Sequence, residues 1–210
     1  MVIGIGGNLG SGKTTLTKFL QNYGAKVIPA DKIGWSLLRK STPQYRKIVQ
    51  SFGKDIQNSN GTISRKKLAK VVFASRKKLA LLNRIVHPAL IDRINKTIGR
   101  FSEKKNIIIL DAALLFNWDK KIPVDVKILV SAKKRLKIAR LKELGISRKE
   151  AERRLSCQLT EKTMAKKADI IVKNNGTKKE LARQAKKLFA EFRKMIDNSV
   201  SNRSNWCRVI

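Results

Sequence analysis

Gly7-Asn8-Leu9-Gly10-Ser11-Gly12-Lys13-Thr14 is the stretch that decides the fold, because it matches the phosphate-binding pattern G-x-x-x-x-G-K-[ST]. In this pattern, backbone N–H groups point at phosphate oxygens and the dipole of the following helix favours negative charge. We therefore predict that this stretch, with Thr15 in the first helical turn, binds a nucleoside triphosphate. Lys13 should reach the β- and γ-phosphates, and the Thr14 hydroxyl should be a ligand of Mg²⁺.

The residues on either side of the stretch fit this interpretation. Val2, Ile3 and Ile5 form a short apolar run that predicts a buried strand before the loop. An apolar helical face follows the loop from Leu16, and Gly24 provides a stop. The sequence thus places the glycine-rich turn between a strand and a helix, as the phosphate site requires.

The composition indicates one domain of 210 residues with an apolar share of 42% and a net charge of +33. Such a charge attracts polyanions, and two interpretations are open. Lysines on solvated helix faces are favoured over a nucleic-acid site, because no basic patch interleaved with aromatic residues is present. We expect no specific nucleic-acid partner.

The remaining bulk features point to the cytoplasm. No apolar run approaches the roughly 18 residues of a membrane span, and no signal-peptide pattern is apparent, so no membrane partner is expected. Cys157 and Cys207 lack metal or redox spacing, which is typical of a reduced compartment. The sequence leaves the oligomeric state open.

Alternating apolar patterns predict an α/β fold, a doubly wound parallel sheet with helices on both faces. Strands are expected at residues 2–5, 26–31, 107–111, 127–130 and 170–172. Helices are expected at 35–52, 64–73, 76–86 and from Pro88 to Gly99, with a break at His87-Pro88. A basic helix with Leu136, Ala139 and Leu144 on its inner face should end at Gly145, and a long amphipathic helix should include 181–196.

Two carboxylates end predicted strands, at the sheet edge where ligands bind in open parallel sheets. Asp31 is a candidate base that takes the proton of an acceptor hydroxyl, or else an aspartate that caps a turn. Asp111 follows four apolar residues and is a candidate for holding Mg²⁺, or else a strand-end residue bonded to nearby backbone.

Three further positions have weaker signals. Arg140 lies on a helix before a turn that suits a closing lid, where an arginine neutralises charge on the transferring phosphoryl group. His87, the single histidine, is more typical of a structural helix terminator than of a catalyst, although it would also suit an anionic ligand. Trp118 and Phe116 are expected in the core or at its rim.

The ordered set of motifs resembles the dephospho-CoA kinases along nearly the whole chain, from about residue 2 to residue 190. The resemblance rests on residues 3–5 and 10–14, 27–33, 60–68, 72–73, 87–88, 111–116, 140–141, 158, 168–169 and 174–176. It implies the three-layer fold of the P-loop NTPases within a single domain, 1–210. Within this domain, the resemblance implies a helical acceptor-binding insertion at 60–100, a short lid at 137–160 and a frayed tail at 198–210.

The resemblance also implies roles for the candidate residues. Asp31 would deprotonate the ribose 3′-hydroxyl of dephospho-CoA, Lys13 and Thr14 would hold ATP and Mg²⁺, and Arg140 would belong to the lid. The helices around Arg65 and His87 would bind the acceptor. Three residues of one turn would lie near the adenine of ATP: Asn174, Asn175 and Gly176.

The chain departs from the family pattern at several positions. The family usually has Thr at the place of Gly6, Gly at that of Asn8, Pro at that of Ala113 and Glu at that of Asn117. A second lid arginine is replaced by the segment that begins with Lys142. Three alternatives therefore stay open: a nucleoside monophosphate kinase-like enzyme, a nucleic-acid-binding nucleotidase and a non-catalytic relative.

Overall fold

The computed structural model describes residues 1–101, 106–118 and 121–198 and contains a parallel sheet in the order β2-β3-β1-β4-β5. The strands are β1 (Val2–Gly6), β2 (Lys26–Pro29), β3 (Ile108–Asp111), β4 (Val126–Ser131) and β5 (Ile170–Lys173). β1 lies in the middle, with Ile3 opposite Ile109 of β3 on one side and Val126 of β4 on the other. The predicted α/β class and parallel sheet are confirmed.

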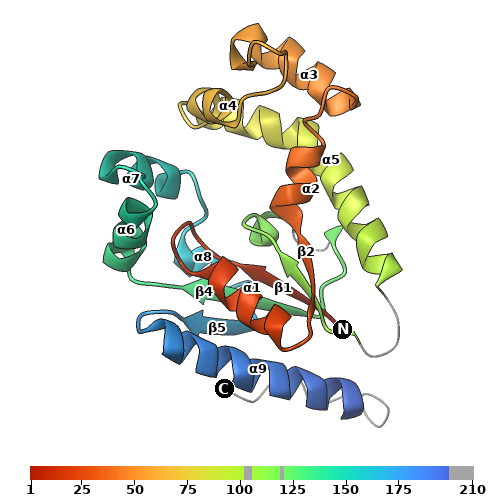
Figure 1. Cartoon of the computed structure of the whole chain (residues 1–210), viewed down its shortest axis with the longest axis vertical. Coiled ribbons are helices and arrows are strands. Elements are labelled where there is room, and N and C mark those ends of the chain that lie inside the picture. The colour runs from red at the N-terminus through yellow and green to blue at the C-terminus, as the bar shows by residue number, and fades with distance from the viewer. Residues whose placement is uncertain (102–105, 119–120, 199–210) are drawn as a thin grey trace.

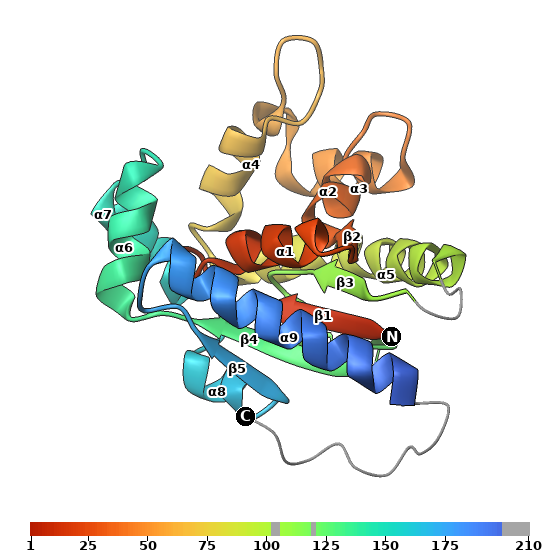
Figure 2. The same ribbon diagram turned by 60° about the horizontal axis from the view of Figure 1, so that its bottom comes forward.

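Two buried apolar clusters, one on each face of the sheet, give the molecule three layers. On one face, helices α1 (Lys13–Asn22) and α9 (Lys178–Asn198) pack side by side (Figure 2). Their apolar faces meet Ile3, Ile5 and Ile109 of the central strands. The predicted inner face of α9 is confirmed, because Leu181, Leu188 and other residues at helical spacing are buried.

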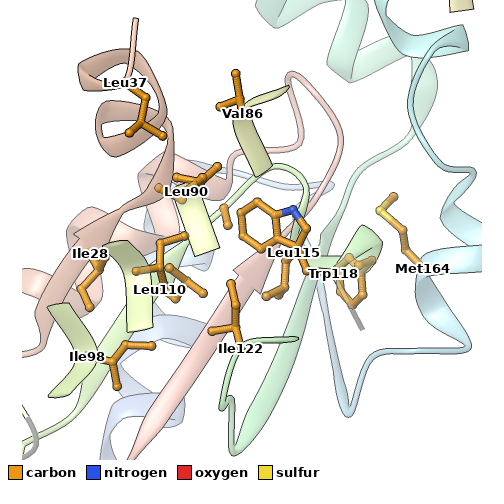
Figure 3. Close-up of a cluster of buried hydrophobic side chains, with 14 of the residues drawn as sticks. Ile28, Leu37, Val86, Leu90, Ile98, Leu110, Leu115, Trp118, Ile122 and Met164 are labelled. Carbon is orange, nitrogen blue, oxygen red and sulfur yellow. The ribbon is translucent and has the colours of Figure 1, made fainter. Parts of the chain in front are cut away.

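On the other face, side chains of β2 and β3 pack against helices and loops that follow them in the chain (Figure 3). Leu115, Phe116 and Trp118 are buried in this cluster, as expected for core residues. Gly6 makes room for the aromatic ring, because a Cβ at this position would lie 2.5 Å from Cε2 of Phe116. The packing thus explains why this chain has glycine at one of its unusual positions.

A group of helices stands above this second face (Figure 1). It consists of α2 (Ala30–Ser36), α3 (Pro43–Phe52), the short 3-10 helix η1 (Lys54–Ile56), α4 (Arg65–Val72) and α5 (Arg76–Arg100). Side chains cap three of the helices: Thr42 caps α3, Ser64 caps α4 and Ser75 caps α5. The segment 60–100 contributes α4 and α5 to this group.

At another side of the molecule, α6 (Lys134–Glu143) and α7 (Arg148–Ser156) form an antiparallel pair, and α8 (Glu161–Ala165) follows (Figure 1). Ser147 caps α7 by accepting from the backbone N–H of Glu150. A 3-10 helix, η2 (Leu115–Asn117), follows β3. None of the described helices is long and apolar enough to cross a bilayer.

The predicted break at His87-Pro88 is wrong. α5 continues through Pro88 to Arg100, although a proline inside a helix removes one backbone hydrogen bond. The helix persists because Val86, Leu90 and other apolar side chains on either side of the proline are buried in the cluster that covers this face of the sheet. Tertiary packing, rather than local propensity, supplies most of a helix's stability.

Three other predicted elements differ in detail. The second strand ends at Pro29 rather than at residue 31, so Asp31 lies in the first turn of α2, where a negative charge suits the helix dipole. The expected helix at 35–52 is divided into α2 and α3. The inner face predicted for α6 is wrong, because Lys137 and Leu141 are its buried residues whereas Leu144 is exposed. The tail predicted at 198–210 lies outside the described residues after position 198.

Candidate functional site

The phosphate-binding stretch forms a turn between β1 and α1, at the carboxyl edge of the sheet. Gly10 and Gly12 have φ values of 77° and 96°, in the left-handed region that favours glycine. Gly12 is also close to a neighbouring loop, because a Cβ there would lie 2.0 Å from Nδ2 of Asn174. Both glycines are therefore required by the backbone path, and no larger residue fits at position 12.

Segments far away in the sequence hold this loop in shape. Asn174 is 6% exposed, and its side-chain amide donates to the backbone oxygen of Ser11 at 2.8 Å. The backbone N–H of Leu9 donates to Oε1 of Gln158 at 3.0 Å. The Asn8 amide donates to the backbone oxygen of Leu159 at 3.4 Å. The structure thus brings Asn174 to the phosphate loop, and it adds Gln158, to which the sequence assigned no role.

The other two residues of the predicted adenine turn have structural partners. Oδ1 of Asn175 accepts from the backbone N–H of Lys133 at 2.8 Å. Gly176 passes close to Glu180, whose carboxylate accepts from the backbone N–H of Thr177 at 2.6 Å. The turn is therefore fixed between β5 and α9, beside the phosphate loop.

Lys13, Asp31 and Asp111 come together at the carboxyl ends of β1, β2 and β3. The Lys13 ammonium pairs with Oδ1 of Asp111, and their side chains are only 12% and 13% exposed. Asp31 lies close enough to interact electrostatically with both groups. Burial raises the pKa of Asp31, the Lys13 charge opposes this rise in pKa, and the Asp111 charge adds to it. The Asp31 side chain nevertheless has an exposed side from which an acceptor can approach.

Thr14 and Asp111 are the predicted metal ligands. Thr14 is exposed in the first turn of α1, whereas Asp111 is paired with Lys13. Among the described residues, no three histidine, cysteine or acidic side chains converge as a metal site. This donor set fits Mg²⁺, which usually keeps several waters and takes its other ligands from substrate phosphates.

Arg140 of α6 bridges the two nucleotide loops. Its guanidinium donates to the backbone oxygens of Gly10 at 3.2 Å, Ser11 at 3.4 Å and Asn174 at 3.0 Å. A planar guanidinium offers several donors in a fixed geometry, which suits this multiple contact. In this arrangement Arg140 fixes carbonyls of both loops.

A buried ion pair fixes the same helix one turn earlier. Nζ of Lys137 lies 2.7 Å from Oε1 of Glu161 on α8, and the hydroxyl of Ser131 donates to the other carboxylate oxygen at 3.0 Å. The backbone of Lys137 touches Gly10, where a Cβ would lie 2.7 Å from its carbonyl oxygen. The sequence prediction missed this pair, because a lysine in a basic helix gives no sign of burial.

A cavity of about 160 Å³ opens beside Asp31. Its walls are largely apolar and come from α2, α4, α5 and the segment after β3, including Trp35, Leu82, His87 and Trp118. His87 contacts Trp118 edge to face, with ring centroids 5.9 Å apart. Burial, together with the charge of Lys121, lowers the pKa of His87, so the ring is neutral at pH 7.

Arg65 lies beyond this cavity, at the start of α4. Its guanidinium stacks on the Trp35 ring, 4.4 Å from the ring centroid. The structure thus brings Asp31, His87 and Arg65 to the same side of the sheet, around Trp35. An apolar cavity with a carboxylate at its edge, next to a triphosphate loop, is suited to phosphoryl transfer onto a bound hydroxyl compound.

Comparisons with known proteins agree with this geometry. The model of the dephospho-CoA kinase family matches residues 1–180. The dephospho-CoA kinase of Aquifex aeolicus is 37% identical over 196 residues, which cover 90% of this chain and 96% of that protein. The enzyme of the same name from Carboxydothermus hydrogenoformans is 36% identical over 84% of this chain and 86% of its own length. The crystal structure of TT1252 from Thermus thermophilus superposes with a TM-score of 0.73 at 26% identity, covering 91% of this chain and 97% of that one.

Proposed function

Because the chain belongs to the dephospho-CoA kinase family, we propose that Lys13, Asp31 and the phosphate loop carry out the reaction of that family. The reaction transfers the γ-phosphoryl group of ATP to the ribose 3′-hydroxyl of dephospho-CoA, giving CoA and ADP, the final step of coenzyme A synthesis. The convergence of Lys13, Asp31 and Asp111 beside an apolar cavity carries the assignment of roles.

The first role is to hold the triphosphate. The glycine-rich loop and the first turn of α1, which includes Thr15, would surround the triphosphate, and Lys13 would supply a positive charge there. Since the transfer needs little covalent help from the protein, positioning and charge neutralisation account for most of the rate. Arg140 contributes by donating hydrogen bonds to the backbone oxygens of Gly10 and Ser11, which holds the loop in shape.

The second role is that of the base. Asp31 accepts the proton of the 3′-hydroxyl while the ribose oxygen bonds to the γ-phosphorus, and the bond to the β,γ-bridging oxygen of ATP breaks, so that ADP leaves. Burial raises the pKa of Asp31, and a carboxylate with a raised pKa is a better proton acceptor than an ordinary aspartate. Its place at the edge of the cavity supports this role.

The third role concerns Mg²⁺, which neutralises charge on the phosphate oxygens when bound. Thr14 and Asp111 would hold the ion, and binding would require Lys13 to move from Asp111 toward the phosphates. The cytoplasmic location and the absence of a nucleic-acid partner stay predictions from composition.

The test is ADP release with and without dephospho-CoA, in the wild type and in Asp31→Ala. We expect release to depend on dephospho-CoA and to fall by roughly 100-fold or more in the variant, the usual contribution of a positioned base, while ATP still binds. Asp92→Ala is the matched control, because Asp92 is an exposed carboxylate paired with Lys96 on α5. Wild-type turnover in Asp31→Ala would remove Asp31 from the role of base.

Two further measurements separate the alternatives. A panel of nucleoside monophosphates as acceptors distinguishes this enzyme from related small-molecule kinases. Addition of DNA or RNA at two salt concentrations detects a nucleotidase stimulated by nucleic acid, since such binding weakens steeply with salt. Lys13→Ala should abolish turnover with every acceptor.

A further inference from the structure

A second hollow adjoins the cavity beside Asp31. It measures about 540 Å³ and shares Trp35 and Leu38 with the first cavity. The rest of its lining comes from the segment after α2, from the turn before α4 and from the first residue of α4, namely Arg39, Lys40, Ser41, Thr62, Ile63 and Arg65. The two cavities therefore meet at the Trp35 side chain, one helical turn beyond Asp31.

The second hollow differs from the first in its charge. Arg39, Lys40 and Arg65 line it, and no acidic side chain does. Among the residues that the structure describes, none of these three cations lies within ion-pair distance of a carboxylate. Three cations that share one hollow repel each other, so an anion with several oxygens would be bound favourably there.

Local contacts hold these cations in place. Arg65 stacks on Trp35, and Lys40 donates to the backbone oxygen of Asn60. The turn that carries Asn60 is itself fixed, because the Tyr45 hydroxyl donates to the backbone oxygen of Gly61 at 2.5 Å. Fixed donors bind an anion better than free side chains do, because less conformational entropy is lost on binding.

We propose that Arg39, Lys40 and Arg65 bind the diphosphate group of dephospho-CoA while its ribose 3′-hydroxyl lies at Asp31. This inference rests on the proposed function, and it divides the acceptor between two adjoining sites. The apolar cavity has too few charged groups to stabilise a diphosphate, whereas the second hollow supplies cations close to Asp31. An acceptor without the diphosphate would lose these contacts.

The test compares two double variants in the full-length protein. Arg39→Gln/Lys40→Gln removes two charges from the second hollow but keeps long polar side chains there. Arg46→Gln/Lys47→Gln is the matched control, because it removes the same two charges from exposed positions on α3, outside the hollow. Thermal unfolding of both variants, followed by circular dichroism, shows whether each one is folded.

We expect the KM for dephospho-CoA to rise roughly tenfold or more in Arg39→Gln/Lys40→Gln, since charge-assisted hydrogen bonds are lost. The KM for ATP and kcat should match those of the control. Raising the salt from about 0.05 M to about 0.5 M should raise the KM for dephospho-CoA in the wild type and the control, and less so in the variant, because salt screens exposed charges.

Equal KM values for dephospho-CoA in the two double variants would overturn the proposal, and so would equal salt dependence. A loss of kcat at unchanged KM would also overturn it. These results differ from a failure of the proposed function, in which the wild type itself does not phosphorylate dephospho-CoA.

Discussion

Removing Glu161 should destabilise the protein more than removing its partner Lys137, although both changes break the same ion pair. The Lys137 side chain is 8% exposed, whereas that of Glu161 is 34% exposed. In Glu161→Leu the ammonium group of Lys137 stays buried without a counter-charge. In Lys137→Met the carboxylate of Glu161 can turn toward water and keep the hydrogen bond from Ser131.

The size of the difference follows from these exposures. Breaking a buried ion pair by removing one partner costs about 3–5 kcal/mol of folding free energy. Because the Glu161 side of the pair is partly exposed to water, we expect the lower end of this range, about 3 kcal/mol, for Glu161→Leu. Lys137→Met should cost about 1 kcal/mol, because the carboxylate left behind is solvated. The double variant Lys137→Met/Glu161→Leu should lie near the single lysine variant, since an apolar pair replaces the ionic one.

Urea unfolding of the four proteins, at fixed pH and salt, measures these free energies as a double-mutant cycle. For a chain of this length, the loss in Glu161→Leu corresponds to a decrease in Tm of about 6–12 °C. The KM for ATP should rise in the same variant, because α6 also carries Arg140, which holds Gly10. Equal losses in the two single variants would refute the reasoning, since they would mean that burial of the lysine has no consequence.

Three other predictions concern the site directly. Gly12→Ala should raise the KM for ATP at least about tenfold in steady-state assays, because φ is positive there and the added Cβ displaces Asn174; an unchanged KM would contradict the close packing. The acid limb of the pH profile of kcat/KM should lie above the ordinary aspartate value of 3.8, because the base must be ionised and the pKa of Asp31 is raised; a limb at or below that value would argue against Asp31. His87→Phe should reduce the loss of stability that occurs as the pH falls. In the wild type, the unfolded chain takes up a proton at His87 below the ordinary pKa of 6.5, whereas the folded chain, in which this pKa is lowered, does not. The free energy of unfolding therefore decreases as the pH falls from 6.5 to the lowered pKa of the folded state. Urea unfolding at two pH values on either side of 6.5 measures this effect, and an equal decrease in the variant would exclude His87 as its source.

Much of the fold was predictable because apolar runs of strand length alternate with helical patterns. The segment 107–111 is apolar enough to be buried on both faces, and the helix that includes Leu181 and Leu188 has a clear apolar face. The break at Pro88 was predicted wrongly because the rule that proline ends a helix considers only the local chain. In α5, burial of the neighbouring apolar side chains compensates for the lost hydrogen bond. This burial depends on residues of other helices and of the sheet, and the sequence of the helix alone does not show which of them it will contact.

The candidate site was predictable where a residue type is needed for a local reason. Lys13 follows from the loop pattern, and Asp31 and Asp111 follow from their places near strand ends. The contact of Gln158 with Leu9 and the pair of Lys137 with Glu161 were not predictable, because they join segments that meet only in the folded chain. The catalytic and binding roles of the site residues stay predictions until the variants are measured.

The position of β1 has a consequence for how the protein is made. This strand is synthesised well before its two neighbours in the sheet, which begin at Ile108 and Val126. The turn after it is completed only by Gln158 and Asn174. During translation β1 must therefore wait for most of the later segments before it can pair, and a nascent chain that stops before residue 158 lacks both side chains that hold the phosphate loop.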